Sequence, residues 1–180
     1  MKNLLFFFTI IILFSFLSCT NSGSGAVTPV ENRDANGALL SRGQNINGVK
    51  TGTWVEYNPD KGLPVKISTW LNGNLDGAYL EFNNRGQIEL SQNYRNNQLH
   101  GPYAKFKFGK TIESVNYTDG KQDGVYRSYF NNTDKLQKEV EYKNGIQHGA
   151  FRQYNEEGKV VLEYQYDNGK VVSGGMTEQN

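Results

Sequence analysis

Residues 77–82 read Gly77-Ala78-Tyr79-Leu80-Glu81-Phe82, and this phrase sets the organisation of the 180-residue chain. It consists of a glycine, any residue, an aromatic residue, two further residues and a second aromatic residue, and it occurs five times. The glycines recur every 23 to 25 residues, and a fixed period in this range indicates a repeat array. The glycine and the two aromatic residues of each copy are Gly52, Trp54 and Tyr57; Gly77, Tyr79 and Phe82; Gly101, Tyr103 and Phe106; Gly124, Tyr126 and Tyr129; and Gly149, Phe151 and Tyr154.

Each phrase is followed by the signals of a β-hairpin. A turn cluster comes first, then an apolar stretch that ends on an aromatic residue, then a turn pair of the type Asn72-Gly73. Asn and Gly tolerate the positive φ angles of tight hairpin turns. Because a lone hairpin is marginal in water, the repeats must stack. The sequence therefore predicts an all-β fold, an elongated antiparallel β-meander of about ten strands built from five tandem hairpins over residues 39–174.

The faces of these strands follow from period-two alternation. The two aromatic residues of the phrase are three residues apart, so either both faces carry aromatic rows or the glycine bends the strand. In the first repeat Val65 and Ile67 have the opposite parity to Trp70, which a bulge or register shift near Pro64 would reconcile. Three second strands are expected to place these residues on one face: Ile88, Leu90 and Tyr94; Leu136, Val140 and Tyr142; Val160, Leu162, Tyr164 and Tyr166.

The repeat resembles the MORN repeat in its shorter bacterial variant, which has the pattern Gly-x-x-x-Gly-x-Tyr-x-x-Tyr. The resemblance covers residues 43–173 and implies an elongated sheet of hairpins that serves as an interaction scaffold. Bacterial chains of this variant are often labelled YwqK-like antitoxins, so it also implies an antitoxin or immunity protein as an alternative function. The glycine pairs Gly48/Gly52, Gly73/Gly77, Gly120/Gly124 and Gly145/Gly149 match the pattern, and Asn97/Gly101 differs at its first position.

The N-terminal residues resemble a bacterial lipoprotein signal. An apolar run from Leu4 to Leu17 follows Lys2, and the sequence Phe16-Leu17-Ser18-Cys19 is similar to a lipobox, with Phe16 in place of the usual leucine. We expect residues 1–18 to be a signal peptide and Cys19, the single cysteine, to carry the lipid. The alternative is an unmodified thiol in a plain signal peptide.

This signal predicts an exported protein of the cell envelope. It would be anchored by its lipid to a bacterial membrane, the outer membrane if the cell has one. Residues 19–38 are rich in Gly, Ser, Asn and Thr and are expected to be a flexible tether. Residues 175–180 are expected to be a disordered tail.

The charge of the chain argues against a nucleic-acid partner. The sequence contains 19 basic and 18 acidic residues, and removal of the signal peptide takes away Lys2 alone. The remaining charge is balanced and no repeat carries a basic face, so the sequence offers no basic surface for binding the phosphates of a nucleic acid.

Few residues suggest chemistry. His100 and His148 both precede a phrase glycine, but they lie two repeats apart, roughly 20 Å along the sheet, which is too far for one metal ion. Glu56 and Glu81 occupy equivalent positions roughly 10 Å apart, near the separation of the two carboxylates in inverting glycosidases. We expect turn residues in the first case and a solvated strand face in the second, with no metal, cofactor or catalytic residue.

The leading hypothesis is therefore a non-enzymatic, membrane-anchored scaffold that binds an envelope protein. The first alternative is the antitoxin or immunity protein. The second is a glycan-binding module, in which a ladder of aromatic rings on an exposed face grips a sugar chain. An enzyme comes last.

Overall fold

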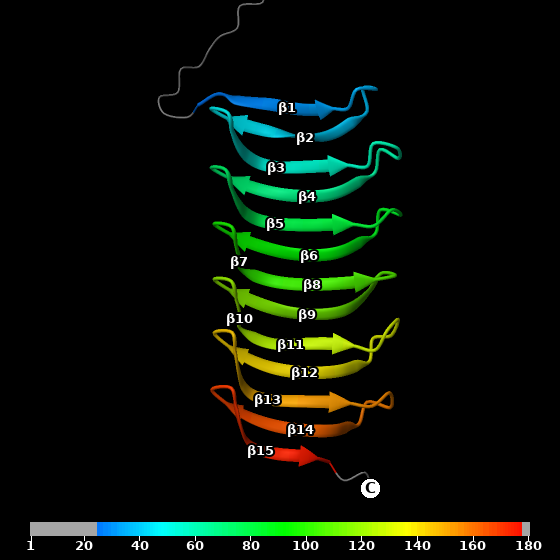
Figure 1. The fold of residues 1–180 in the computed structure, drawn as a ribbon, viewed down its shortest axis with the longest axis vertical. Helices are drawn as coiled ribbons and strands as arrows, with labels where there is room; N and C mark the ends of the chain where they lie inside the picture. Colours follow the sequence, from blue (N-terminus) through cyan, green and yellow to red (C-terminus); the bar gives the residue numbers. More distant parts are fainter. Residues whose placement is uncertain (1–24, 178–180) are drawn as a thin grey trace, which may run out of the picture.

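The computed structural model describes residues 25–177, which form one antiparallel β-sheet. Figure 1 shows the strands stacked along the long axis, with turns alternating between the two sides. Thirteen strands follow one another in chain order, while the two-residue strands β7 and β10 pair beside β6 and β9. The predicted all-β antiparallel meander is confirmed, with fifteen strands in place of about ten. Within residues 25–177, the structure contains no helix of the length and apolar character needed to cross a membrane.

The strands are β1 (Val27–Arg33), β2 (Leu39–Ile46), β3 (Val49–Tyr57), β4 (Pro64–Leu71), β5 (Asn74–Phe82), β6 (Ile88–Arg95), β7 (Gln98–Leu99), β8 (Gly101–Lys107), β9 (Lys110–Thr118), β10 (Lys121–Gln122), β11 (Gly124–Tyr129), β12 (Leu136–Lys143), β13 (Ile146–Tyr154), β14 (Val160–Asp167) and β15 (Lys170–Met176).

The array begins earlier than the sequence predicts. Strand β1 lies inside the stretch expected to be a flexible tether, where it pairs along its whole length with β2. Val30 lies opposite Gly43 in this pair, and backbone pairing compensates for the small apolar content of the strand. The expectation of a tether is therefore wrong for 27–33, and that of a disordered tail is wrong for Gly175 and Met176, which belong to β15. Residues 1–24, which include the expected signal peptide and Cys19, and residues 178–180 lie outside the described part of the chain.

Every hairpin contains the same one-residue bulge. In the β3–β4 pair, Glu56 lies opposite Lys66 and Tyr57 lies opposite Pro64, so Val65 has no partner. Corresponding register shifts occur in the other hairpins. The bulge lies on the second strand, and the first strand alternates without interruption, so the two aromatic residues of each phrase, three residues apart, lie on opposite faces. Face A carries Trp54, Tyr79, Tyr103, Tyr126 and Phe151, and face B carries Tyr57, Phe82, Phe106, Tyr129 and Tyr154.

The bulge corrects the expected faces of the second strands. Ile88 pairs with Phe82 on face B, whereas Leu90 pairs with Glu81 on face A. The same shift separates Leu136 from Val140 and Val160 from Leu162. In the first repeat the bulge is at Val65, which is not between Ile67 and Trp70. Ile67 and Trp70 therefore stay on opposite faces. An unpaired residue interrupts the alternation, and sequence parity alone does not show it.

The phrase glycine bends the strand. The five phrase glycines have φ between 63° and 112°, and beside Gly77 the register jumps from Ser68–Tyr79 to Trp70–Leu75. The bend lets each turn contact the turn of the next repeat. Gly73 N donates to Lys50 O over 3.0 Å, Asn97 N donates to Leu75 O over 2.9 Å, and the pattern continues in Gly120 to Leu99, Gly145 to Gln122 and Gly169 to Gln147.

We predict that Gly77→Ala lowers the free energy of unfolding by about 1–3 kcal/mol, because a side chain at φ 112° is strained. A Cβ at this position would also lie 3.1 Å from the Cβ of Thr69. Denaturant unfolding followed by circular dichroism measures the change. Gly175→Ala is the matched control, since Gly175 lacks the positive φ and an added Cβ there meets no atom within 4 Å. Equal stability of the two variants would contradict the role assigned to the bend.

Candidate binding surfaces

The centre of face A is a row of side chains that crosses the sheet. Trp54, Ser68, Tyr79 and Gln92 lie opposite one another in successive strands, and the Tyr103–Val115 and Tyr126–Val140–Phe151 pairings follow the same pattern. Five of the six buried residues in the described chain belong to this row. They are Trp54, Ser68, Gln92, Val115 and Val140, with exposed fractions from 2% to 7%.

The rings of face A pack on one another. Tyr79 meets Tyr94 edge to face at a centroid separation of 5.6 Å, and Tyr103 meets Tyr117 in the same way. Such pairs contribute about 0.5–1.5 kcal/mol beyond the burial of area. Their polar atoms also have partners within the face, since Tyr79 Oη donates to Glu81 over 2.7 Å.

Small residues and cations complete the packing of these rings. A Cβ on Gly43 would lie 2.3 Å from the ring of Trp54, so only glycine admits that ring. The Trp54 Nε1 donates to Gln44 O over 3.1 Å. Lys50 Nζ lies 4.3 Å from the Trp54 ring centroid and 4.7 Å from that of Trp70, at the range of a cation–π contact.

Glu113 is the centre of a polar cluster on face A. Its carboxylate accepts hydrogen bonds from the hydroxyls of Tyr103 and Tyr126, each over 3.2 Å, and lies 2.9 Å from Lys105 Nζ. Burial acts to raise the pKa of Glu113, but the bonds from Lys105 and the two tyrosines outweigh it and lower the pKa. Burial, together with the Glu113 charge, raises the pKa of Tyr103 and Tyr126. The polar groups of this cluster thus satisfy one another.

Face B has an unbroken central row of different composition. Adjacent strands place its residues opposite one another from β1 to β15. The row begins with two charged residues, continues with three aliphatic residues, three small residues and four charged residues, and ends with a glycine. Its members are Glu31, Arg42, Val55, Ile67, Leu80, Ser91, Ala104, Ser114, Arg127, Glu139, Arg152, Glu163 and Gly175.

The charged part of this row is paired internally. Arg127 Nε and Arg152 Nε lie 2.8 Å from carboxylate oxygens of Glu139 and Glu163, respectively. Tyr154 Oη also donates to Glu139 over 2.7 Å. Burial acts to raise the pKa of Glu139, yet the bonds from Tyr154 and Arg127 lower it. These side chains form ion pairs and hydrogen bonds with one another, so few of their hydrogen-bonding atoms are available to a ligand.

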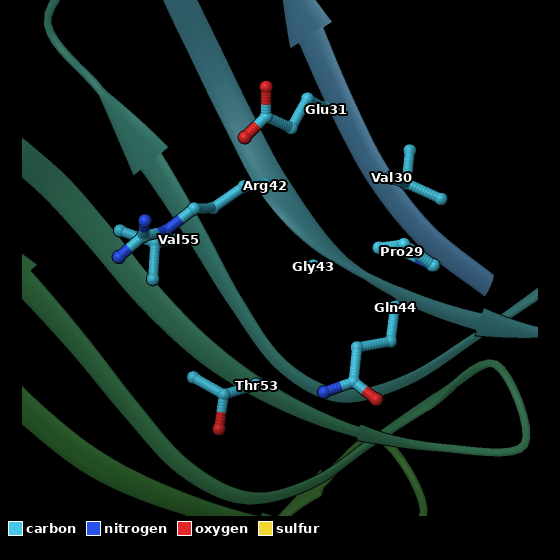
Figure 2. A pocket seen from close by; sticks show the side chains of 8 residues that line it. All are labelled: Pro29, Val30, Glu31, Arg42, Gly43, Gln44, Thr53 and Val55. Atoms are coloured by element: carbon cyan, nitrogen blue, oxygen red, sulfur yellow. The ribbon is translucent and has the colours of Figure 1, made fainter. Parts of the chain in front are cut away.

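The apolar part is different, and we name Arg42, Val55, Ile67 and Leu80 the apolar strip. Val55, Ile67 and Leu80 are half-buried on a sheet face that no second layer from residues 25–177 covers. A hollow of about 320 Å³ opens at the β1 end of the strip. Figure 2 shows Arg42 extending beside Val55 at one side of this hollow, with Gln44 and Thr53 at the other.

Arg42 supplies the charge of this surface. Its guanidinium carbon lies 5.8 Å from the centroid of the Tyr57 ring, and it forms no ion pair within residues 25–177. Glu31, which lies opposite Arg42 in the sheet, is bonded to Arg33 over 2.8 Å instead. Arg42 therefore offers an exposed guanidinium at the end of an apolar row.

The other residues singled out from the sequence lie apart from this strip. Glu56 and Glu81 lie on face A in neighbouring repeats, and Lys66 lies between them. Lys66 Nζ is 3.0 Å from Glu56 Oε2. His100 and His148 each contact an aspartate next to the following turn, Asp119 at 3.1 Å and Asp167 at 3.3 Å. Over the described residues, no group of three histidine, cysteine or acidic side chains is placed to hold a metal ion.

No family model and no curated protein matches this sequence. The surface must therefore be interpreted from its own chemistry.

The pKa of Glu113 predicts a pH dependence of stability. A carboxyl group whose pKa is lower in the folded than in the unfolded state stabilises the fold above its unfolded value, near 4.5. That stability is lost as the pH falls through the lowered folded value. We predict that Glu113→Gln makes the urea midpoint less dependent on pH below 4.5 than in the parent chain.

The control for this prediction is Glu89→Gln. Glu89 is an exposed acid in the bulge of β6, so its replacement should leave the acid limb of the stability curve unchanged. If the urea midpoint of Glu113→Gln depends on pH below 4.5 in the same way as that of the parent chain, Glu113 is not the source of the pH dependence.

Proposed function

We propose that this chain is a non-catalytic, lipid-anchored module that binds a protein at the bacterial cell envelope through the apolar strip on face B. The observation that carries the proposal is the contrast between the two faces. Face A packs its rings on one another, whereas the apolar strip presents three aliphatic side chains, an unpaired arginine and a hollow. An apolar area rimmed by polar groups is typical of a binding site.

The strip suggests the chemistry of its partner. Val55, Ile67 and Leu80 would bury aliphatic or aromatic side chains, and Arg42 would hold a carboxylate in a bidentate hydrogen bond. The strip crosses four strands at about 4.8 Å each, roughly 15 Å in length. A protein segment with apolar side chains followed by an acidic residue fits this surface.

The position of the strip is compatible with a membrane anchor. Its first strands, β2 and β3, are near the N-terminal end of the described chain, and the lipobox-like sequence ends at Cys19. A partner bound at the strip would therefore be held within reach of the membrane that carries the lipid. The proposed anchor rests on sequence alone.

Crosslinking in intact cells tests the binding surface. We expect a tagged chain to capture one dominant protein, and Arg42→Glu or Ile67→Glu to lower its yield at least about tenfold, the effect of losing a residue that carries binding energy. Arg85→Glu and Ile146→Glu are the matched controls, since both residues are exposed and lie outside the strip, Arg85 in a turn and Ile146 at the start of β13. Equal loss in strip and control variants, or no loss in either, would refute the assignment of the strip.

A glycan is the second candidate ligand, and one observation favours it. The rings of Tyr57, Phe82, Phe106, Tyr129 and Tyr154 recur on face B once per repeat, roughly every 10 Å. Aromatic rings at such a period suit stacking against successive sugars. Retention of the parent chain on purified envelope glycan, lost in Phe82→Ala and Phe106→Ala but kept in Ile67→Glu, would favour this candidate over the protein partner.

The proposed anchor makes a separate prediction. In Cys19→Ser the sulfur that would carry the acyl chain is missing, so we expect no incorporation of labelled palmitate and release of the chain from the membrane fraction. Ser18→Ala, next to the proposed cleavage site, should retain both. Membrane retention of Cys19→Ser at the parent level would show that another segment holds the chain.

A further inference from the structure

Four of the hairpin turns have the same two residues at their centre, an asparagine followed by a glycine. Both residues have positive φ, from 47° to 53° for the asparagine and from 80° to 83° for the glycine, as a two-residue hairpin turn requires. All of them are exposed to solvent. The pairs are Asn47-Gly48, Asn72-Gly73, Asn144-Gly145 and Asn168-Gly169. Because the pairs match in residue type, backbone conformation and exposure, they form a set in which the effect of the surroundings on reactivity can be compared.

An asparagine that precedes a glycine loses its side-chain amide without an enzyme or a cofactor. The glycine nitrogen attacks the asparagine Cγ, the Cγ–Nδ2 bond breaks, and the amide leaves as ammonia with the proton of the glycine nitrogen. Water then opens the cyclic imide, at Cγ to leave aspartate or at the main-chain carbonyl carbon to leave isoaspartate. The glycine N–H has to give up its proton and turn toward the asparagine side chain, so a hydrogen bond that holds this N–H opposes the reaction.

In three of the four turns, the preceding repeat holds the glycine N–H. Gly48 belongs to the first of these turns, and within residues 25–177 its N–H donates to no backbone carbonyl of another turn. The chain at Gly25 lies beside the Asn47 side chain instead, since a Cβ on Gly25 would come 2.3 Å from Asn47 Oδ1. The three bonds run from Gly73 N to Lys50 O over 3.0 Å, from Gly145 N to Gln122 O over 2.7 Å and from Gly169 N to Gln147 O over 2.8 Å.

From this difference we infer that Asn47 is a modification site, at which the folded chain deamidates before the other three asparagines of the set. The turn at Asn47 opens without breaking a bond to another repeat. Each of the other three turns must first release one backbone hydrogen bond, whose net contribution corresponds to a factor of about two to ten in the population of the open turn. The inference concerns a covalent change and does not depend on the proposed binding function.

The isoaspartate product affects the hairpin that begins the apolar strip. It routes the main chain through the former side chain of residue 47, which lengthens the two-residue turn between β2 and β3 by a methylene group. Turn geometry and loop length fix the register of a hairpin. Arg42 of β2 and Val55 of β3 lie opposite one another in this hairpin, so isoaspartate at residue 47 is expected to loosen their pairing.

A time course of deamidation tests this inference on the full chain. The purified protein is kept in mildly alkaline buffer, once folded and once unfolded in urea, and its tryptic peptides are quantified by mass spectrometry. Cleavage after lysine and arginine places the four pairs in separate peptides. The unfolded chain gives the rate that local sequence alone sets at each asparagine. We expect the ratio of the folded to the unfolded rate to be about two to ten times larger for Asn47 than for Asn72, Asn144 and Asn168.

Two results would overturn the inference. The first is a folded-to-unfolded ratio for Asn47 that is equal to or smaller than that of any of the other three asparagines. The second is a folded chain in which Asn47 stays intact while it reacts in the unfolded chain. The measurement uses no binding partner, so neither result bears on the apolar strip, and failure of the crosslinking experiment would leave the deamidation rates unchanged.

Discussion

A sheet one layer thick must bury its apolar surface with its own side chains, and this constraint governs the rest of the molecule. Face A meets it by alternating large rings on one strand with smaller residues on the next. Tyr79 lies between Ser68 and Gln92, and Tyr126 pairs with Val140. The rings pack on these smaller neighbours and on one another, so a row of side chains across the sheet takes the place of the hydrophobic core of a layered fold. Repetition is then a necessity, because one hairpin offers its rings nothing to lean on.

Two irregularities per repeat make this arrangement possible, and they act separately. The bulge, at Val65 in the first phrase repeat, brings Pro64 of the second strand to face B, opposite Tyr57, while Ser68 stays on face A opposite Trp54. The glycine bend, at Gly77 in the next, directs the turn toward its neighbour so that backbone hydrogen bonds join successive turns. Side chains thus connect the repeats in the middle of the strands, and the backbone connects them at the turns.

The phrase predicts the fold type because it is local: turn residues, ring spacing and glycines lie within one repeat of 23 to 25 residues. The sequence does not predict the first hairpin, because Val30 and Arg33 stand at the positions that hold the two aromatic residues in later repeats. Only the Asn47-Gly48 turn indicates that a strand precedes residue 47. Bulge positions such as Leu40, Val65 and Glu89 share no residue type, so only cross-strand pairing identifies them. The apolar strip escapes for the same reason, since its members are brought together by the sheet and not by sequence.

The two faces carry different constraints, and this difference suggests how such an array acquires a binding surface. On face A a substitution disturbs the rings of the adjacent repeats as well, because each ring contacts residues on both sides. On face B the central row changes from aliphatic through small to charged without altering the sheet. A partner that contacts Val55, Ile67 and Leu80 makes no demand on Arg127 or Glu139. Recognition confined to one segment of face B is therefore compatible with a fold maintained along the whole of face A.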